Sequence, residues 1–227
     1  MGGETKGMIT LYGDVTKTRA NRCSWMLGEL EQEHERRPLA FRPGDRRPAD
    51  FLALNPNGKL PTLEDGDFTL FESLAINLYL AKKYGGMLGP QSFEEDALMT
   101  QWSLWVVTEI EKPLLMASAI RVLFDPPKPS DDEFELAMER LSRPWTVLDS
   151  HLRNYRFMMG ERFTVADLNI AAVMHLVPIA GIDISRWPAM KYWLETCLER
   201  PAAVDARTVN FKVPRPATPR DILAMFL

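Results

Sequence analysis

Two short segments carry residue types that could hold a peptide-like ligand. The first is the turn Asn55-Pro-Asn-Gly-Lys-Leu-Pro61, which leads into a β-rich run. Pro61 cannot donate a ladder hydrogen bond, and a cis bond before it would leave the backbone N–H and C=O of Leu60 open at a sheet edge. An extended peptide could then pair with Leu60 as an added strand, whereas a trans bond would make this an ordinary turn.

The second segment is Glu72-Ser73, where a helical period begins. The unpaired N–H groups of a helix start, its positive dipole end and the Ser73 hydroxyl all favour a carboxylate. Glu72 could take the ammonium of the same group, so the pair suits an α-amino acid. Both residue types are also common at helix starts as caps alone. Lys59 could meet a second carboxylate or remain solvated.

The sequence shows no pattern of side chains that would make one of the protein's own residues the nucleophile of a reaction. Cys23 and Cys197 lie on apolar helical stripes, outside metal spacing, and are expected in the core. His34, His151 and His175 are scattered, without the pattern of a triad or a metal site. No dinucleotide or Walker signature occurs. Any reactive group is therefore expected to come from the ligand, and no metal is expected.

The elements that must position these residues form two unlike halves. The first half is a mixed α/β domain, residues 1–86, with β-rich runs and helical periods at 8–12, 23–30, 38–42, 62–64, 68–71 and 72–84. The second half, 87–227, has only helical periods, at 98–110, 134–152, from 164 and 190–197. Pro113 should kink or end the first of these helices. A proline-rich tail starts near residue 209.

Two motifs refine this picture of the second half. Thr164-Val-Ala-Asp167 is a capping box that starts a helix, and Phe163 and Leu168 are placed to form its hydrophobic staple. The stretch Lys212 to Arg220 holds too many prolines for a helix. The second half is therefore predicted to be all-α.

Composition places the chain among soluble globular proteins. Its 227 residues are 46% hydrophobic and 26% charged, and the net charge is −4. That charge gives no electrostatic reason to expect nucleic acid. No apolar run approaches the roughly 18 residues of a membrane span. Two cysteines fit a reducing cytoplasm, so a cytoplasmic protein with small-molecule or protein partners is expected.

The motifs together resemble a known family. The stretch Asn55 to Gly66, followed by Phe71-Glu-Ser-Leu-Ala-Ile-Asn-Leu-Tyr-Leu80, resembles the glutathione-binding half of cytosolic glutathione transferases. Phe163-Thr-Val-Ala-Asp167 resembles the helix-start motif of their second half, and the likeness covers roughly residues 8 to 205. The resemblance implies an α/β thioredoxin-like N-terminal domain plus an all-α C-terminal domain, usually in a homodimer.

The resemblance also implies roles for single residues. Pro61 would be the cis-proline, and Leu60 the backbone partner of the cysteinyl part of glutathione. Glu72 and Ser73 would hold its γ-glutamyl end, and Lys59 its glycyl carboxylate. Glutathione would be the co-substrate.

The family further needs a hydroxyl near the first helix to stabilise the glutathione thiolate. Thr18-Arg-Ala-Asn-Arg22 resembles the Ser-Arg-x-x-Arg helix start of bacterial members, so Thr18 ranks first, Thr16 second and Tyr12 third. The alternative is that Thr18 only caps the helix. Lowering a thiol pKa from about 8.5 by about two units requires about 2.7 kcal/mol, which a helix start and one donor can supply.

The stretch Thr16 to Arg22 contains no cysteine, which argues against chemistry through a protein mixed disulfide. The expected activity is conjugation of glutathione to a small apolar electrophile, with Trp105 and Thr108 as candidate walls of the electrophile pocket. The alternatives are a non-catalytic binding or assembly module of the same fold, or a glutathione-dependent isomerase, dehalogenase or peroxidase.

Overall fold

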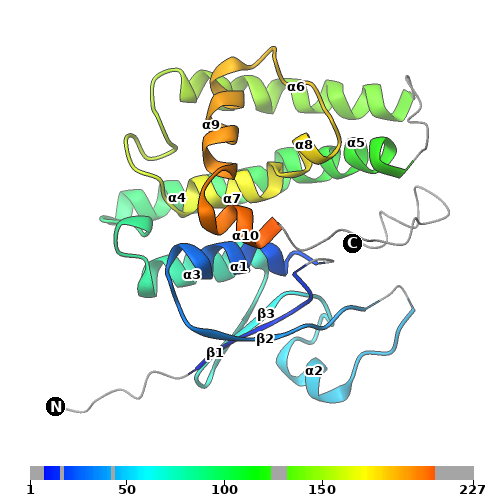
Figure 1. The fold of residues 1–227 in the computed structure, drawn as a ribbon, viewed down its shortest axis with the longest axis vertical. Helices are drawn as coiled ribbons and strands as arrows, with labels where there is room; N and C mark the ends of the chain where they lie inside the picture. Colours follow the sequence, from blue (N-terminus) through cyan, green and yellow to red (C-terminus); the bar gives the residue numbers. More distant parts are fainter. Residues whose placement is uncertain (1–7, 16–17, 42–43, 124–131, 208–227) are drawn as a thin grey trace. The chain divides into compact units, whose positions relative to one another are not determined.

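The computed structural model describes residues 8–15, 18–41, 44–123 and 132–207. They form two compact units (Figure 1). The first runs to Gly85 and also contains α10 (Pro201–Arg207), which packs on α1 (Ala20–Glu29); the second is Gly86–Arg200. The sequence predicts a division into 1–86 and 87–227, whereas α10 belongs to the first unit. The proline-rich tail lies outside the described residues.

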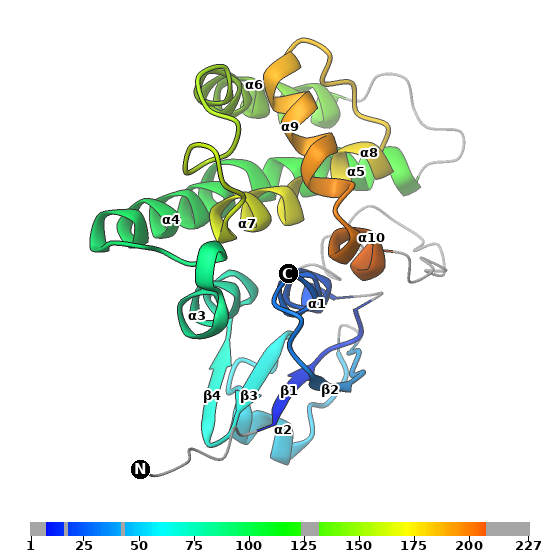
Figure 2. The ribbon, with the colours of Figure 1, turned by 60° about the vertical axis from the view of Figure 1, so that its left-hand side comes forward.

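The first unit is built on a four-stranded sheet in the order β2-β1-β3-β4. Its strands are β1 (Ile9–Tyr12), β2 (His34–Arg37), β3 (Thr62–Asp65) and β4 (Phe68–Phe71). β1 pairs with β2 in parallel and with β3 antiparallel, and β3 and β4 form the expected hairpin. Figure 2 shows α1 and α3 (Ser73–Tyr84) on one face of the sheet and α2 (Ala49–Leu54) on the other.

Strand alternation assigns β1 side chains to these two faces. Tyr12 contacts Phe51 of α2, with 6.4 Å between the ring centroids. Because neighbouring strand residues point to opposite faces, Leu11 and Ile9 belong to the face covered by α1 and α3. All three side chains are buried, as expected for β1, one of the two inner strands of the sheet.

Two elements of this unit differ from the sequence expectation. β2 is His34–Arg37 rather than 38–42, and α2 was not expected at all. β2 is a polar strand at the sheet edge, partly exposed along its whole length, so it shows no alternation of apolar residues. α2 has six residues and buries only Phe51, which is too short for a helical period to be visible.

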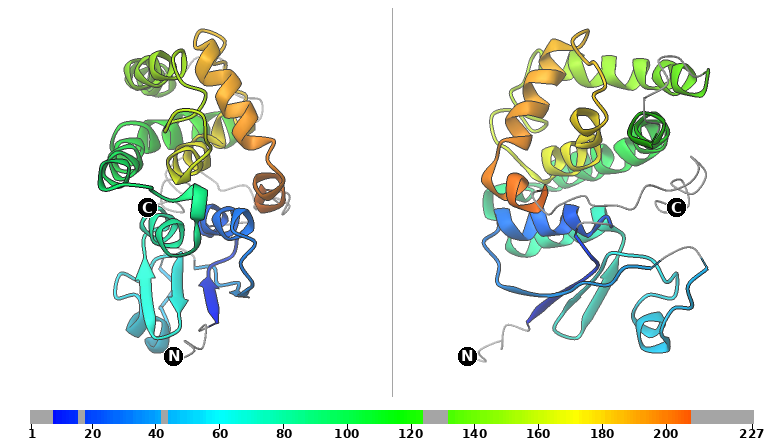
Figure 3. Two further views of the ribbon diagram at one scale, coloured as in Figure 1. Left: turned by 90° about the vertical axis from the view of Figure 1, so that its left-hand side faces the viewer. Right: turned by 45° about the vertical axis from the view of Figure 1, so that its right-hand side comes forward.

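The named elements of the second unit, within its described residues, are all helices, and the only β pairing among these residues is an isolated bridge between Phe157 and Gly160. The helices are η1 (Gly86–Leu88), α4 (Phe93–Trp105), η2 (Val106–Glu111), α5 (Lys112–Leu123), α6 (Asp132–Leu152), α7 (Val165–Met174), α8 (Leu176–Ile179) and α9 (Pro188–Leu198). Every residue of α7 is buried, and α7 packs against α4, η2 and α9 (Figure 3). None of the helices in the described part is both long and apolar enough to cross a membrane.

Pro113 does not end the first long helix. It is the second residue of α5, and the six residues before α5 form a π-helix, η2. A proline ring clashes with the carbonyl four residues back and offers no N–H to it. The wider π-helical turn accommodates that clash without ending the helix.

The capping box at the start of α7 is present as expected. The backbone N–H and the hydroxyl of Thr164 both donate to Asp167 Oδ2, at 3.0 and 3.1 Å, while the Thr164 hydroxyl accepts from the Ala166 N–H. Asp167 Oδ1 accepts from the Met158 N–H at 2.8 Å and from Trp193 Nε1 at 2.9 Å. Burial of this carboxyl raises its pKa to about 6. Asp167 thus ties three segments of the unit together.

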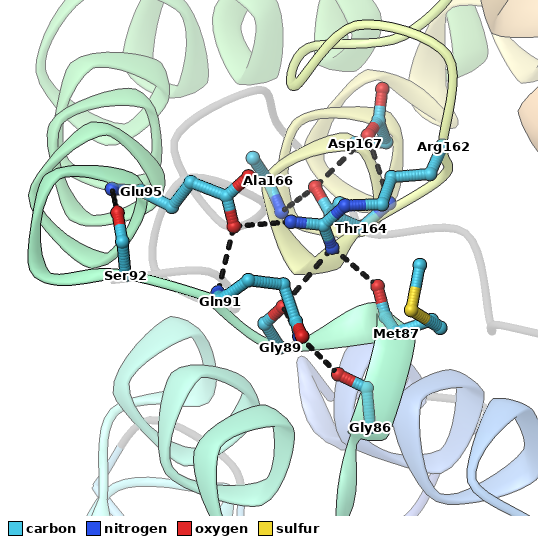
Figure 4. A network of polar contacts seen from close by, with 10 residues as sticks. All are labelled: Gly86, Met87, Gly89, Gln91, Ser92, Glu95, Arg162, Thr164, Ala166 and Asp167. Carbon is cyan, nitrogen blue, oxygen red and sulfur yellow. Dashed lines mark hydrogen bonds and ion pairs between the residues drawn. The ribbon is translucent and has the colours of Figure 1, made fainter.

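Arg162 ties the first residues of the second unit to its body (Figure 4). Its Nη1 donates to the carbonyls of Met87 and Gly89, at 2.5 and 3.1 Å, and its Nη2 pairs with the Glu95 carboxylate on α4. Gln91 Nε2 also donates to the Gly86 carbonyl at 2.9 Å. The segment directly after Gly85 is therefore held to α4 by side chains.

Candidate functional site

Three backbone segments meet at one end of the sheet in the first unit. Thr62, the first residue of β3, pairs with Tyr12 at the end of β1 and with Phe71 at the end of β4. Leu60-Pro61 leads directly into β3, and Glu72-Ser73 leads directly out of β4. The structure therefore places both segments that the sequence singled out at the same end of one hairpin.

Leu60 offers the backbone groups that an added strand would need. The bond between Leu60 and Pro61 is cis, as the resemblance implies. The strand ladder begins only at Thr62, and the described hydrogen bonds include none to the backbone of Leu60. Leu60 is half-buried and Lys59 beside it is exposed. Among the described residues, the N–H and C=O of Leu60 therefore have no backbone partner in the sheet.

The turn before Pro61 is held by two residues that sequence reasoning missed. The buried Asn55 donates from Nδ2 to the Lys59 carbonyl at 2.8 Å and to Thr62 Oγ1 at 3.3 Å. Arg47 donates from Nε to the Gly58 carbonyl at 2.9 Å. Gly58 has φ +61°, and a Cβ there would lie 2.9 Å from Arg47 Cγ. The Asx-turn tendency of Asn55 was the signal available in the sequence.

The start of α3 combines a buried hydroxyl with an unusual backbone. Ser73 is the first residue of α3 and is buried, whereas Glu72 is exposed. Glu72 has φ 72° and ψ 112°, a region that costs a non-glycine residue about 1–3 kcal/mol. Strain of this kind is found where a functional geometry requires it. The Ser73 hydroxyl accepts from Arg22 Nη1 at 3.4 Å.

Thr18 lies near the Leu60 turn, but its hydroxyl has local partners. Thr18 Oγ1 donates to the Asp14 carbonyl at 2.8 Å and accepts from the Ala20 N–H at 3.2 Å, so it caps the start of α1. A Cβ added to Gly13, which has φ +134°, would lie 3.0 Å from Thr18 Oγ1 and 3.6 Å from Leu60 Cβ. The Thr18 hydroxyl and the Leu60 side chain therefore both lie next to Gly13.

The other two candidate hydroxyls are those of Tyr12 and Thr16. Tyr12 donates its phenol proton to the Glu64 carboxylate and packs on Phe51, the side of the sheet that α2 covers. Burial and this hydrogen bond raise the pKa of Tyr12 to about 12, so the phenol stays protonated and engaged. Thr16 lies outside the described residues.

Trp105 and Thr108 belong to the second unit. Trp105 lines a cavity of about 310 Å³ together with side chains of η2 and α6: Glu109, Arg143, Pro144 and Val147. Thr108 is exposed, and its hydroxyl donates to the Trp105 carbonyl at 3.2 Å. Of the two candidates, only Trp105 lines this cavity.

The cysteines are core residues, as expected. Cys23 and Cys197 are fully buried and unbridged. Burial raises the pKa of the Cys23 thiol well above its usual value, so this thiol is not a nucleophile at neutral pH. Within the described ranges, no group of three or more His, Cys, Asp or Glu side chains is placed to hold a metal ion.

A mixed sheet of this order, a turn with a cis-proline and a helical unit with a buried capping box define a glutathione transferase fold. The family model "Glutathione S-transferase, N-terminal domain" matches residues 7–82, and "Glutathione S-transferase, C-terminal domain" matches residues 112–201. The chain therefore belongs to the glutathione S-transferase family, and the α/β thioredoxin-like plus all-α fold class is confirmed.

Individual relatives agree with this assignment. Glutathione S-transferase 3 of Zea mays is 32% identical over 204 residues, covering 86% of this chain and 90% of the relative. GstB of Escherichia coli K12 is 29% identical and covers 86% and 95%. Among solved structures, a theta-class glutathione S-transferase of Xanthomonas axonopodis pv. citri with glutathione bound is 25% identical, with TM-score 0.77, covering 90% and 99%. Glutathione S-transferase-I with lactoylglutathione is 26% identical, also with TM-score 0.77, covering 88% and 98%.

Proposed function

We propose that this protein binds glutathione in the first unit and activates its thiol for attack on a small apolar electrophile. One observation carries the proposal: the Leu60-Pro61 turn, the start of α3 at Ser73 and the start of α1 at Thr18 are gathered at one end of the sheet. Structures similar to this chain contain glutathione and lactoylglutathione, which supports the choice of ligand.

Each part of glutathione has a matching group in the proposed pose. Its cysteinyl backbone pairs with the N–H and C=O of Leu60, as an added strand does. Its γ-glutamyl carboxylate is held by Ser73 and the N–H groups of α3, and its ammonium by Glu72. Lys59, which is exposed, meets the glycyl carboxylate. The cis bond before Pro61 allows this arrangement at the strand end.

The proposed reaction transfers the sulfur to the acceptor. The thiol releases its proton to solvent water, the thiolate attacks an electrophilic carbon to form a C–S bond, and the leaving group departs with the electron pair of the bond that it had to that carbon. Thr18 is the proposed donor to the thiolate, which requires its hydroxyl to turn away from the Asp14 carbonyl. Thr16 is the second choice. Trp105 and Thr108 remain the proposed residues of the second unit for the apolar acceptor.

One observation favours a second candidate function, a binding or assembly module without turnover. The Thr18 hydroxyl has a complete set of local partners, as a structural cap would have. In that case the protein would hold glutathione and leave the thiol pKa unchanged. Turnover of a chlorodinitrobenzene-type acceptor therefore separates the two candidates, because only the enzyme accelerates that reaction.

Ser73→Ala tests the seat of the γ-glutamyl group. We expect the dissociation constant of glutathione to rise about tenfold, because a hydrogen bond to a charged group contributes about 1.5 kcal/mol or more. Ser24→Ala, a second buried serine of the same unit on α1, should leave the affinity unchanged. Titration calorimetry measures all three proteins. Equal affinities of wild type and Ser73→Ala would contradict the proposed pose.

We also propose that two chains pair. On α4 the apolar side chains of Phe93 and Leu104 are 92% and 63% exposed, and they lie three helical turns apart on one face. Light scattering should give twice the 25.9 kDa of one chain. Leu104→Glu should shift the mass toward that of one chain. A wild-type mass of 25.9 kDa would contradict pairing.

A further inference from the structure

A buried arginine contacts Ser73, the residue proposed to bind the γ-glutamyl carboxylate. Arg22 on α1 is 4% exposed, and its Nη1 is 3.4 Å from the hydroxyl oxygen of Ser73 on α3. The two helices pack side by side on the same face of the sheet (Figure 2). A guanidinium stays charged at any pH a protein tolerates, so this is a permanent positive charge below the start of α3.

The packing of α1 on α3 fixes the position of this charge. Asn77 of α3 is fully buried and donates from Nδ2 to the Arg22 carbonyl at 3.3 Å. The neighbouring Cys23 thiol lies 3.6 Å from the Ser73 carbonyl. The first contact joins the backbone of α1 to a side chain of α3, and the second joins a side chain of α1 to the backbone of α3. The guanidinium therefore does not depend on a flexible surface side chain for its placement.

The direction of the hydrogen bond determines what Ser73 can do next. A guanidinium is only a donor, so the Ser73 oxygen is the acceptor in this contact. The hydroxyl proton of Ser73 is then directed elsewhere. A donor that is itself polarised by a buried cation binds an anion more strongly than it binds a neutral group. The pair Arg22–Ser73 thus favours a carboxylate over an amide or an alkyl group at this place.

We propose that Arg22 is a positioning residue that makes the seat at Ser73 selective for the α-carboxylate of the γ-glutamyl group. The inference rests on the proposed function, because it takes glutathione as the ligand. Arg22 acts through Ser73, by orienting its hydroxyl and by adding charge in a water-poor site. The seat then rejects thiol peptides that lack this carboxylate.

The test compares two ligands in three proteins. The ligands are glutathione and γ-aminobutyryl-cysteinylglycine, which differs from glutathione only by the missing α-carboxylate. The proteins are wild type, Arg22→Met and Arg22→Lys, with Arg36→Met, an exposed arginine of the same unit, as the matched control. Titration calorimetry gives each dissociation constant, and thermal unfolding reports folding.

We expect Arg22→Met to weaken glutathione about tenfold and to leave the affinity for the analogue unchanged, because only glutathione carries the group that Arg22 serves. Arg22→Lys should retain part of the preference for glutathione over the analogue. If Arg22→Met does not fold, the two dissociation constants of Arg22→Lys are compared with those of the wild type instead. Parallel losses for both ligands would show a purely structural role and overturn this inference alone. A wild type that binds no glutathione would overturn the proposed function and this inference with it.

Discussion

Asp167→Ala is expected to lower the free energy of unfolding of the helical unit by about 3–5 kcal/mol. The fully buried carboxylate accepts hydrogen bonds from Thr164, Met158 and Trp193. Alanine leaves these donors without an acceptor, and each unsatisfied buried donor costs about 1–3 kcal/mol. The start of α7 also loses its capping box, a further cost of about 1 kcal/mol. Denaturant unfolding followed by circular dichroism measures the change.

Asp183→Ala is the matched control for this prediction. Asp183 lies in the same unit and also caps a local turn, through the Ser185 N–H and hydroxyl. The Asp183 side chain is exposed, so its replacement by alanine should lower the free energy of unfolding by about 1 kcal/mol or less. If both variants changed the unfolding free energy equally, the account of Asp167 as the link between three segments would be wrong.

The pKa of Asp167 adds a pH signature to the same site. Burial raises this pKa from 3.8 to about 6, so the folded protein holds the proton more tightly than the unfolded chain does. A raised carboxyl pKa stabilises the fold below about pH 4, and that stabilisation is lost as the pH rises through about 6. Relative to Asp167→Asn, the wild type should therefore gain up to about 3 kcal/mol between pH 6 and 4. Parallel pH curves for the two proteins would contradict the shift.

Thr18→Ala is expected to reduce kcat/KM for conjugation about 10- to 100-fold near neutral pH. If the Thr18 hydroxyl stabilises the thiolate, its loss returns the glutathione thiol toward its free pKa of about 8.5. Less thiolate is then present at neutral pH. Because the variant raises the thiol pKa, its deficit should shrink as the pH rises above about 8.5. A pH profile of kcat/KM with a chlorodinitrobenzene-type acceptor measures this.

The control for Thr18 is a variant that keeps the hydroxyl. Thr18→Ser should retain both activity and the cap on the Ala20 N–H, whereas Thr18→Ala also loses about 1 kcal/mol of stability from that cap. A uniform loss of activity at every pH would assign Thr18 to capping alone. Full activity in Thr18→Ala with a loss in Thr16→Ala would move the thiolate donor to Thr16.

Local sequence patterns predicted the parts of the fold that depend on residues close together in the chain. The hairpin around Gly66, the start of α3 at Ser73 and the capping box at Thr164 each depend on neighbours within about five residues. Their residue types were therefore sufficient to predict them. The same is true of the cysteines, whose stripe positions already indicated burial.

Features set by distant partners could not be predicted in this way. β2 is a polar edge strand that is recognisable only through its pairing with β1, and α10 returns to α1 after the whole helical unit. The contact of Arg22 with Ser73 could not be predicted, because nothing local reveals that Ser73, 51 positions later, lies beside it. The π-helical turn before Pro113 likewise depends on packing that keeps the long helix intact.

The most direct test of the account is a crystal structure of this protein with glutathione bound. It should show the cysteinyl backbone hydrogen-bonded to the N–H and C=O of Leu60, and the γ-glutamyl carboxylate at the Ser73 hydroxyl. Glutathione found away from Leu60, or bound with its glycyl end at Ser73, would contradict the central claim.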